Sequence, residues 1–382
     1  MRSSNRVKSR RVLLITDIFP PLVGGPASFI DELAHHLAAR GHRVTVVCAM
    51  LDGRRDGDSV RPFRVSRVPR DNQYRFEIEM RMRLLVTLAT HGTIFVNGLE
   101  DYLAPIVRVL RRRPVVKVVG DYVWERARNR GETVEDIERF QGSVSSRPTW
   151  QARRERLRRF LEAARGILVP SHYLSKLVQE WGLPASKVTV VPNGGDGSTS
   201  DDRLAPELRP VRVLYVGRLT NWKGVETALL ACARAAGATI TIAGDGPEQP
   251  MLQHLADQIG LGSRAAFLGR VDRSRVADLY ATHDVLVLSS LYEGMSHTIL
   301  EAMASGLPVI ASDCGGNSEL VRDRVEGFLV PPLRPDAIAS CLDELLGSTA
   351  LWSAMSRSAR RRAAEFNKER SLRDTADILL RD

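Results

Sequence analysis

The chain has 382 residues, of which 43% are hydrophobic and 26% charged, with a formal net charge of +10. The length favours two globular domains, and these fractions are too apolar for a disordered chain. No stretch approaches the ~20 consecutive apolar residues of a membrane-spanning helix. The four cysteines are scattered, without metal-ligand or paired spacing, so we expect a reduced, cytoplasmic protein.

The start of the chain, MRSSNRVKSRRVLLITDIFPP, places basic residues before an apolar run, as a signal peptide does. The run is short and is broken by Asp17, Pro20 and Pro21. We therefore interpret it as a basic tail followed by the first β-strand.

Strand-like and helix-like segments alternate along the chain, which is the pattern of parallel α/β domains. Residues 11–49 read as strand, Gly-Pro loop, amphipathic helix and strand, and the pattern restarts at residue 211. Between them, the segment 193–210 is rich in Gly, Ser, Asp and Pro and is typical of a linker. Further strands are predicted at 93–97, 114–119, 166–170, 187–192, 265–268, 284–288 and 308–311, with two or three helices closing the chain.

The fold class is therefore α/β, with two Rossmann-like domains facing across a cleft. We predict an N-terminal domain at 1–198, a linker at 199–210 and a C-terminal domain at 211–364, with a last helix at 365–382 that packs back on the first domain. Ligands in such sheets bind beyond the carboxyl ends of the strands. The loops after VLLIT, VLYVG and VLVLSS should face the cleft.

The charge is unevenly distributed. Residues 1–200 contain 34 Lys and Arg against 21 Asp and Glu, a net +13, whereas the remainder contains 21 against 24, a net −3. The basic half either binds an anionic partner or presents its charges only to solvent. The sequence contains no recognisable nucleic-acid-binding motif, so the basic charge does not by itself indicate a nucleic-acid partner.

The loop VGRLTNWKGVE offers Arg218 and Lys223 between a strand and a helix start. A guanidinium, an ammonium and free helix N–H groups together attract a phosphate. The alternative is that Lys223 merely decorates the helix start and Arg218 pairs with a surface carboxylate.

The segment YEGMSHTILEAMASGLPVIASD, residues 292–313, predicts a helix that starts near Ser296 or His297 and ends before Gly306. Glu293 and Glu301 are eight positions apart, which at ~100° per residue brings their directions within about 80°. Both carboxylates can then address one site. Glutamates on a solvated helix are the alternative.

Several motifs occur in a fixed order. They are FPPLVGG, RGHRVTVV and VPNGGD in the first half, then VGRL…KG, AGDGP, FLGRV, LYEGMSHTILEAMASGLPVIAS and EGFLVPP. This order resembles the retaining GT-B glycosyltransferases of family 4, whose C-terminal domain is known as glycosyl transferases group 1. The resemblance covers nearly the whole chain and is most specific from Val213 to Pro332.

The resemblance implies transfer of a sugar from a UDP- or GDP-linked donor to a hydroxyl acceptor, with retention of configuration and without a divalent metal or other cofactor. The acceptor would belong to a polysaccharide, a glycolipid or a natural-product glycoside. The polar stretch 51–62, which contains Asp56 and Asp58, is accordingly interpreted as a loop and not as a metal site. The alternatives are a GT-B type nucleotide-sugar epimerase and a non-catalytic nucleotide-sugar-binding protein.

The resemblance also implies roles for individual residues. Arg218 and Lys223 would neutralise the diphosphate as charge develops on the leaving group. Glu301 would accept hydrogen bonds from the ribose, and Glu293 would hold the transferred sugar. The remaining donor-binding positions are Gly24, Gly25, the Arg270-Val271 backbone and the amides of Gly294, Met295 and Ser296.

The chain departs from the family pattern in VVKVVGDYVWERARNRG, where Gly120 and Asp121 stand at the place of a histidine found in many members. Asp121 is predicted either to act as a polar contact or proton acceptor for the acceptor hydroxyl, or to cap the next turn. Predicted acceptor contacts are Tyr122, Trp124, Glu125 and Arg126. A Trp packed between helices is the alternative for Trp124.

Two basic stretches, 108–114 and 150–166, predict peripheral contact with an anionic membrane at its inner face. The alternative for the second stretch is an ordinary amphipathic helix that packs its apolar side on its own sheet. That side would consist of Trp150, Leu157, Phe160 and Leu161.

Overall fold

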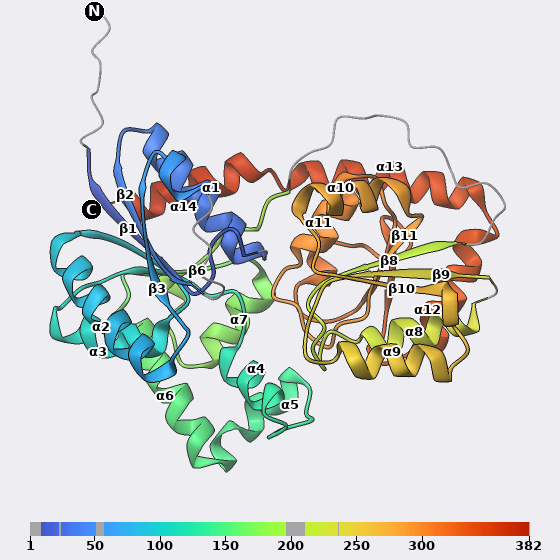
Figure 1. Ribbon diagram of the computed structural model, residues 1–382, viewed down its shortest axis with the longest axis horizontal. Coiled ribbons are helices and arrows are strands. Elements are labelled where there is room, and N and C mark those ends of the chain that lie inside the picture. Colours follow the sequence, from blue (N-terminus) through green and yellow to red (C-terminus); the bar gives the residue numbers. More distant parts are fainter. Residues whose placement is uncertain (1–8, 23, 51–56, 196–210, 236, 382) are drawn as a thin grey trace, which may run out of the picture.

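The structure is a computed structural model that describes residues 9–22, 24–50, 57–195, 211–235 and 237–381 (Figure 1). The predicted linker, 199–210, lies outside the described residues, as does Asp56. The chain forms two parallel α/β halves that lie side by side, and we call them the first half (β1–β7) and the second half (β8–β13).

The first half is built on seven parallel strands in the order β3-β2-β1-β4-β5-β6-β7. The strands are β1 Arg11–Thr16, β2 Arg43–Met50, β3 Arg64–Pro69, β4 Thr93–Asn97, β5 Val115–Lys117, β6 Gly166–Val169 and β7 Val188–Val190. Its helices are α1 Gly25–Ala39, α2 Gln73–Thr90, α3 Glu100–Val109, α4 Tyr122–Asn129, α5 Ile137–Ser143, α6 Pro148–Ala163 and α7 His172–Glu180.

Alternate residues of β1 point to opposite faces of this sheet. Leu13 and Ile15 share a buried cluster with α2, α3, α6 and α7. Val12 and Leu14 share another with α1 and with α14, Lys368–Leu380. Both faces are therefore covered, which explains why the strands are almost continuously apolar.

The second half has six parallel strands in the order β10-β9-β8-β11-β12-β13. They are β8 Arg212–Val216, β9 Thr239–Ala243, β10 Ala265–Gly269, β11 Val285–Leu288, β12 Val309–Ser312 and β13 Gly327–Val330. The helices are α8 Val225–Arg234, α9 Gln249–Gln258, α10 Arg273–Thr282, α11 His297–Ala304, α12 Pro335–Leu346 and α13 Thr349–Glu365.

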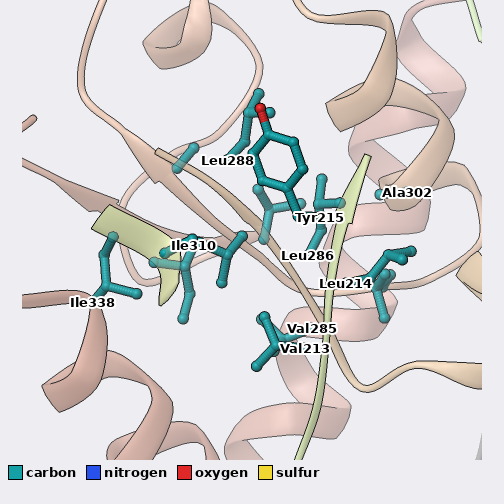
Figure 2. Close-up of a cluster of buried hydrophobic side chains, with 14 of the residues drawn as sticks. Val213, Leu214, Tyr215, Val285, Leu286, Leu288, Ala302, Ile310 and Ile338 are labelled. Carbon is teal, nitrogen blue, oxygen red and sulfur yellow. The ribbon is translucent and has the colours of Figure 1, made fainter. Parts of the chain in front are cut away.

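The core of the second half lies between its central strands and the helices that cover them. Figure 2 shows strand residues such as Val213, Leu286 and Ile310 packed with Ala302 of α11 and Ile338 of α12. Tyr215 belongs to this cluster, but its hydroxyl lies 3.2 Å from the Lys223 carbonyl and donates a hydrogen bond to it. The core thereby fixes the loop that follows β8.

The last helix returns to the first half. Asn367 caps α14 by accepting a hydrogen bond from the Arg370 amide, and Leu372, Ala376 and Leu379 are buried among residues of α1, β1 and β2. Figure 1 shows this helix beside α1, after the long α13 has crossed over from the second half.

The predicted α/β fold of two parallel-sheet halves is confirmed. Every strand predicted from the sequence is present, and its ends differ from the prediction by at most two residues. β3 and β13 were not predicted, since their short runs, RVSRVP and GFLV, give little periodicity. Among the described residues no helix is long and apolar enough to cross a membrane.

Candidate active site at the junction of the two halves

The loop between β8 and α8 presents a lysine to the junction of the two halves. Its Nζ atom lies 2.6 Å from Oε1 of Glu293, and the Ser290 hydroxyl donates to the same oxygen at 2.7 Å. The side chain of Lys223 is 22% exposed and that of Glu293 is 11% exposed. The two sequence-predicted residues therefore form a charge-assisted pair that is largely shielded from solvent.

A glycine makes the position of this lysine possible. Gly224 has a φ of 65°, and a Cβ added there would collide with the Ser289 carbonyl at the end of β11. The Ser289 hydroxyl donates to the Gly224 carbonyl at 2.6 Å. The loop is thus fixed directly against the end of the neighbouring strand.

Arg218 lies in the same loop and is exposed. Among the residues that the structure describes, none forms an ion pair or hydrogen bond with its side chain. An exposed guanidinium in the same loop as Lys223, close enough to Glu125 to lower its pKa, gives this side of the junction a second cation for an anionic ligand.

The N-terminus of α11 completes this side of the junction. Ser296 is the N-cap and accepts a hydrogen bond from the Ile299 amide at 3.2 Å, as the predicted helix start requires. Gly294 packs so closely against the Val119 carbonyl of the first half that no Cβ would fit. Met295 is buried, and its carbonyl accepts a hydrogen bond from the Asn193 side chain at 3.1 Å.

The remaining donor-side predictions lie on neighbouring elements. Glu301, on α11, accepts a hydrogen bond from the Tyr280 hydroxyl at 3.2 Å. Arg270 is exposed and donates across the junction to the Pro21 carbonyl at 3.4 Å, and Val271 packs against the core of the second half.

Gly24 and Gly25 lie at the start of α1, on the other side of the junction. A Cβ added at Gly25 would lie 2.5 Å from Cδ2 of His297, the first residue of α11. A larger residue therefore cannot occupy this position unless the His297 imidazole or one of the halves shifts.

Asp121 takes the capping role that we considered as the alternative. Its side chain is fully buried and accepts hydrogen bonds from the amides of Val123 and Trp124, from Gln141 and from the guanidinium of Arg154. Both carboxylate oxygens are occupied, so Asp121 orients α4 and we leave it out of the proposed site.

The four predicted acceptor contacts on α4 separate into two groups. Trp124 is fully buried, with its indole N–H donating to the Glu135 carbonyl and its ring packed against Trp222 and Tyr292. Tyr122 and Arg126 both reach Asp101 of α3. These contacts hold α4 in place, with Trp124 packed against the donor loop through Trp222, and Glu125 is the carboxyl of α4 that lies near Lys223 and Glu293.

Glu125 extends over Gly120. A Cβ added at that glycine would lie 2.6 Å from Oε1 of Glu125 and 3.5 Å from the Tyr292 hydroxyl. The pKa of Glu125 is raised to about 7, chiefly by burial; Lys223 and Arg218 lower it, and the nearby Asp121 and Glu293 contribute to the rise. This carboxyl thus shares the electrostatic environment of the Lys223–Glu293 pair.

Sequence reasoning missed several residues at this junction. The hydroxyl of Tyr292 is buried and has no hydrogen-bond partner among the described residues. Glu100, at the start of α3, has a pKa raised to about 7 by burial and by Asp101 and Asp17. Its position directly after the strand β4 was the signal that could have identified it.

Polar contacts between the halves surround this site. Glu319 of the second half accepts hydrogen bonds from the amides of His172 and Tyr173 at the start of α7, at 2.9 and 2.8 Å. Ser171 donates to the Gly294 carbonyl at 2.6 Å, and Asn221 donates to the Arg128 carbonyl at 3.2 Å. The two halves therefore meet in a closed arrangement around Lys223 and Glu293.

Comparison with known proteins identifies the class. Residues 23–197 match the model of Glycosyltransferase Family 4, and residues 199–362 match Glycosyl transferases group 1. The chain belongs to this glycosyltransferase family and has the GT-B fold. The resemblance to GT-B glycosyltransferases of family 4, inferred from the motifs, is confirmed.

Three relatives illustrate the likeness. An uncharacterized glycosyltransferase of Methanocaldococcus jannaschii is 27% identical over 88% of this chain and 89% of its own length. Sucrose-phosphate synthase from Thermosynechococcus elongatus has a TM-score of 0.80 at 23% identity, covering 97% of this chain and 98% of its own. HepE from Anabaena, solved in complex with UDP and glucose, has a TM-score of 0.76 at 20% identity, covering 97% and 99%.

Proposed function

We propose that this glycosyltransferase moves a sugar from a nucleotide-diphosphate sugar to a hydroxyl acceptor with retention of configuration. The observation that carries the proposal is the pairing of Lys223 with Glu293 beside the exposed Arg218, at the junction of the two halves. When the diphosphate leaves, negative charge develops on its oxygen, and two fixed cations stabilise that charge more than they stabilise the bound donor.

Lys223 has two partners in this scheme. In the structure it forms an ion pair with Glu293. With a donor bound, its ammonium contacts the phosphate, and Glu293 accepts hydrogen bonds from hydroxyls of the transferred sugar. Glu301 would bind the ribose in the same complex, and the N-terminal dipole of α11 would favour the phosphate nearest the sugar.

In the reaction the bond between the anomeric carbon and the phosphate oxygen breaks, and its electrons go to the diphosphate. The acceptor oxygen forms a new bond on the same face of the sugar. Its proton passes to the departing phosphate oxygen. This step needs no divalent metal in our proposal, because Arg218 and Lys223 supply the positive charge.

The first half supplies the acceptor site. Glu125 is the group on α4 that faces Lys223 and Glu293, and its ionised carboxylate would accept a hydrogen bond from the attacking hydroxyl. The buried Tyr292 hydroxyl lies near the same carboxyl, above Gly120, and offers a second polar contact from the second half. An acceptor rich in hydroxyl groups matches these partners.

The test is a thermal-shift panel with UDP, GDP, ADP and TDP and their common sugar conjugates, in the presence of EDTA. UDP is the first candidate, because HepE was solved with UDP and with UDP-glucose. We expect one nucleotide to raise the melting temperature, since a ligand of the folded state must stabilise it. Absence of a shift at millimolar concentration with every nucleotide would contradict the donor site, and a product of inverted configuration by NMR would contradict retention.

A further inference from the structure

Helix α2 exposes a row of apolar side chains to solvent. Tyr74, Ile78, Met82, Leu85 and Val86 are 77%, 46%, 57%, 40% and 59% exposed. At ~100° per residue these five positions fall within an arc of about 120° on one side of the helix. Five of the twelve large hydrophobic residues that are exposed in the described part of the chain therefore belong to one stripe.

The fold does not need this stripe. The opposite side of α2 already contributes Phe76, Met80, Leu84 and Leu88, which are all fully buried in the core of the first half. A surface helix of a globular protein normally has one apolar face. A second apolar face, directed away from the core, indicates an interaction surface.

Charged side chains lie within the stripe, at Arg75, and along its edges. Arg75 pairs with Glu79 at 2.7 Å, and Arg81 lies 3.8 Å from Glu77. All four are on the same helix, so along most of its length the charges beside the stripe are balanced.

The C-terminal end of α2 is different, because it is basic. Helix α3 lies alongside, with Tyr102 edge-on to Phe76 at 5.6 Å and Arg112 donating to the Ala89 carbonyl at 2.9 Å. At this end are exposed arginines for which the described residues provide no ion-pair partner, together with Val109, which is 76% exposed. These arginines are Arg83, Arg108, Arg111 and Arg113.

We propose that the exposed face of α2, with the basic end of α3, docks on the surface of an anionic lipid bilayer. The apolar stripe would insert at the boundary between headgroups and acyl chains, and the unpaired arginines would contact lipid phosphates. Figure 1 shows both helices on the outer side of the first half, far from the second, so docking leaves the junction accessible.

This proposal assigns the membrane contact to a segment that the sequence did not single out. Of the two predicted basic stretches, 150–166 forms α6, whose apolar residues Trp150, Leu157, Phe160 and Leu161 are buried in the first half. The ordinary amphipathic helix is thus the correct interpretation of that stretch. The other stretch, 108–114, supplies the basic end of the α2 surface.

The test is co-sedimentation of the full chain with vesicles, either of pure phosphatidylcholine or of phosphatidylcholine mixed with phosphatidylglycerol. We expect binding to the anionic vesicles alone, weakened by salt. The triple variant Ile78→Gln, Met82→Gln, Val86→Gln should lower the partition coefficient roughly tenfold or more. The charge variant Arg108→Gln, Arg111→Gln, Arg113→Gln should lower it by a similar factor.

Matched controls distinguish an effect of this surface from a general effect of removing exposed apolar side chains or positive charge. Val134→Gln with Met251→Gln replaces two exposed apolar residues elsewhere, and Arg139→Gln, Arg370→Gln, Arg373→Gln removes the same charge from other helices. These should sediment like the wild type. Absence of sedimentation at low salt, or equal loss in both sets of variants, would overturn the proposal. A lipid-free dimer that the α2 variants dissociate would also overturn it, by showing that a second copy covers the stripe.

Discussion

Gly25 and His297 meet across the junction so closely that a Cβ at Gly25 would lie 2.5 Å from Cδ2 of the imidazole. Gly25 begins α1 and His297 begins α11, so this contact brings together the N-termini of two helices from different halves. Both termini carry the partial positive charge of the helix dipole. A ligand phosphate beside this contact would be attracted by both termini.

Gly25→Ala should displace the His297 imidazole or separate the two halves, while leaving each half folded. The imidazole or one whole half must move, and a displacement of about 1 Å at a site of this kind can lower turnover roughly 100-fold. The measurement is release of nucleoside diphosphate from the nucleotide sugar that the binding panel identifies.

The matched control is Gly92→Ala, because a Cβ at Gly92 meets nothing within 4 Å and its φ is not in the left-handed region. It should leave turnover unchanged. If Gly25→Ala is as active as Gly92→Ala, the close contact with His297 has no part in assembling the site.

Lys223→Met should impair both donor binding and stability. Removing the ammonium leaves Glu293 largely buried with Ser290 as its remaining partner among the described residues, which costs about 1–3 kcal/mol of unfolding free energy. Loss of a cation from the leaving-group site should lower turnover by about 10²–10³-fold. Calorimetry measures the stability, a nucleotide titration measures donor binding, and release of nucleoside diphosphate measures turnover.

Lys176→Met is the control, since Lys176 is an exposed lysine on α7. A Lys223→Met variant that retains the nucleotide affinity of the wild type would contradict the assignment of Lys223 to the diphosphate.

Much of this site was predictable because strand-loop-helix order fixes where loops meet. Lys223 and Glu293 follow β8 and β11, which are neighbours in the sheet, so their loops had to lie together at its carboxyl edge. Gly224 and Ser296 are recognisable as the residues at the starts of α8 and α11.

The residues of the acceptor side could not be predicted from the order of strands, loops and helices in this way. Asp121 and Glu125 are one helical turn apart, and the sequence alone does not reveal which of the two carboxylates already has its hydrogen-bond partners within the protein. Asp121 receives hydrogen bonds from Arg154 and Gln141, which lie 33 and 20 residues further along the chain. Trp124 was ambiguous for a similar reason, because its partners Trp222 and Tyr292 come from the other half.

Glu125→Gln should abolish the rise of activity through neutral pH. The pKa of this carboxyl is raised to about 7, so the folded enzyme gains the ionised form only as the pH increases through that value. If the ionised carboxylate of Glu125 accepts a hydrogen bond from the attacking hydroxyl group, turnover of the wild type at saturating donor should rise across pH 6–8. The Gln variant should be about 10²-fold slower and should lack this limb of the profile.

Glu125→Asp should recover part of the rate, because it restores a carboxylate at a greater distance. Glu180→Gln, a change at an exposed position on α7, is the control. Nucleotide affinity should be unchanged in all three variants. Loss of affinity in Glu125→Gln would instead place this residue in the donor site.

Lys117→Met should stabilise the protein, and the gain should shrink as the pH rises. Lys117 is buried on β5, with Nζ 3.0 Å from Oδ1 of Asn193 and 3.5 Å from the centre of the Phe29 ring. Burial lowers the pKa of its amine from 10.5 to about 7. Between these values the unfolded chain holds a proton that the folded chain lacks, so wild-type stability increases with pH over this window.

Methionine removes that linkage, since it fills the same space without a titrating group. The variant should therefore be more stable by about 2 kcal/mol near pH 7, after the loss of the hydrogen bond to Asn193 is subtracted. The difference should fall steadily as the pH approaches 10. Chemical denaturation at pH 7, 8 and 9 measures it, and a difference that stays constant or grows with pH would show that Lys117 is charged in the folded protein.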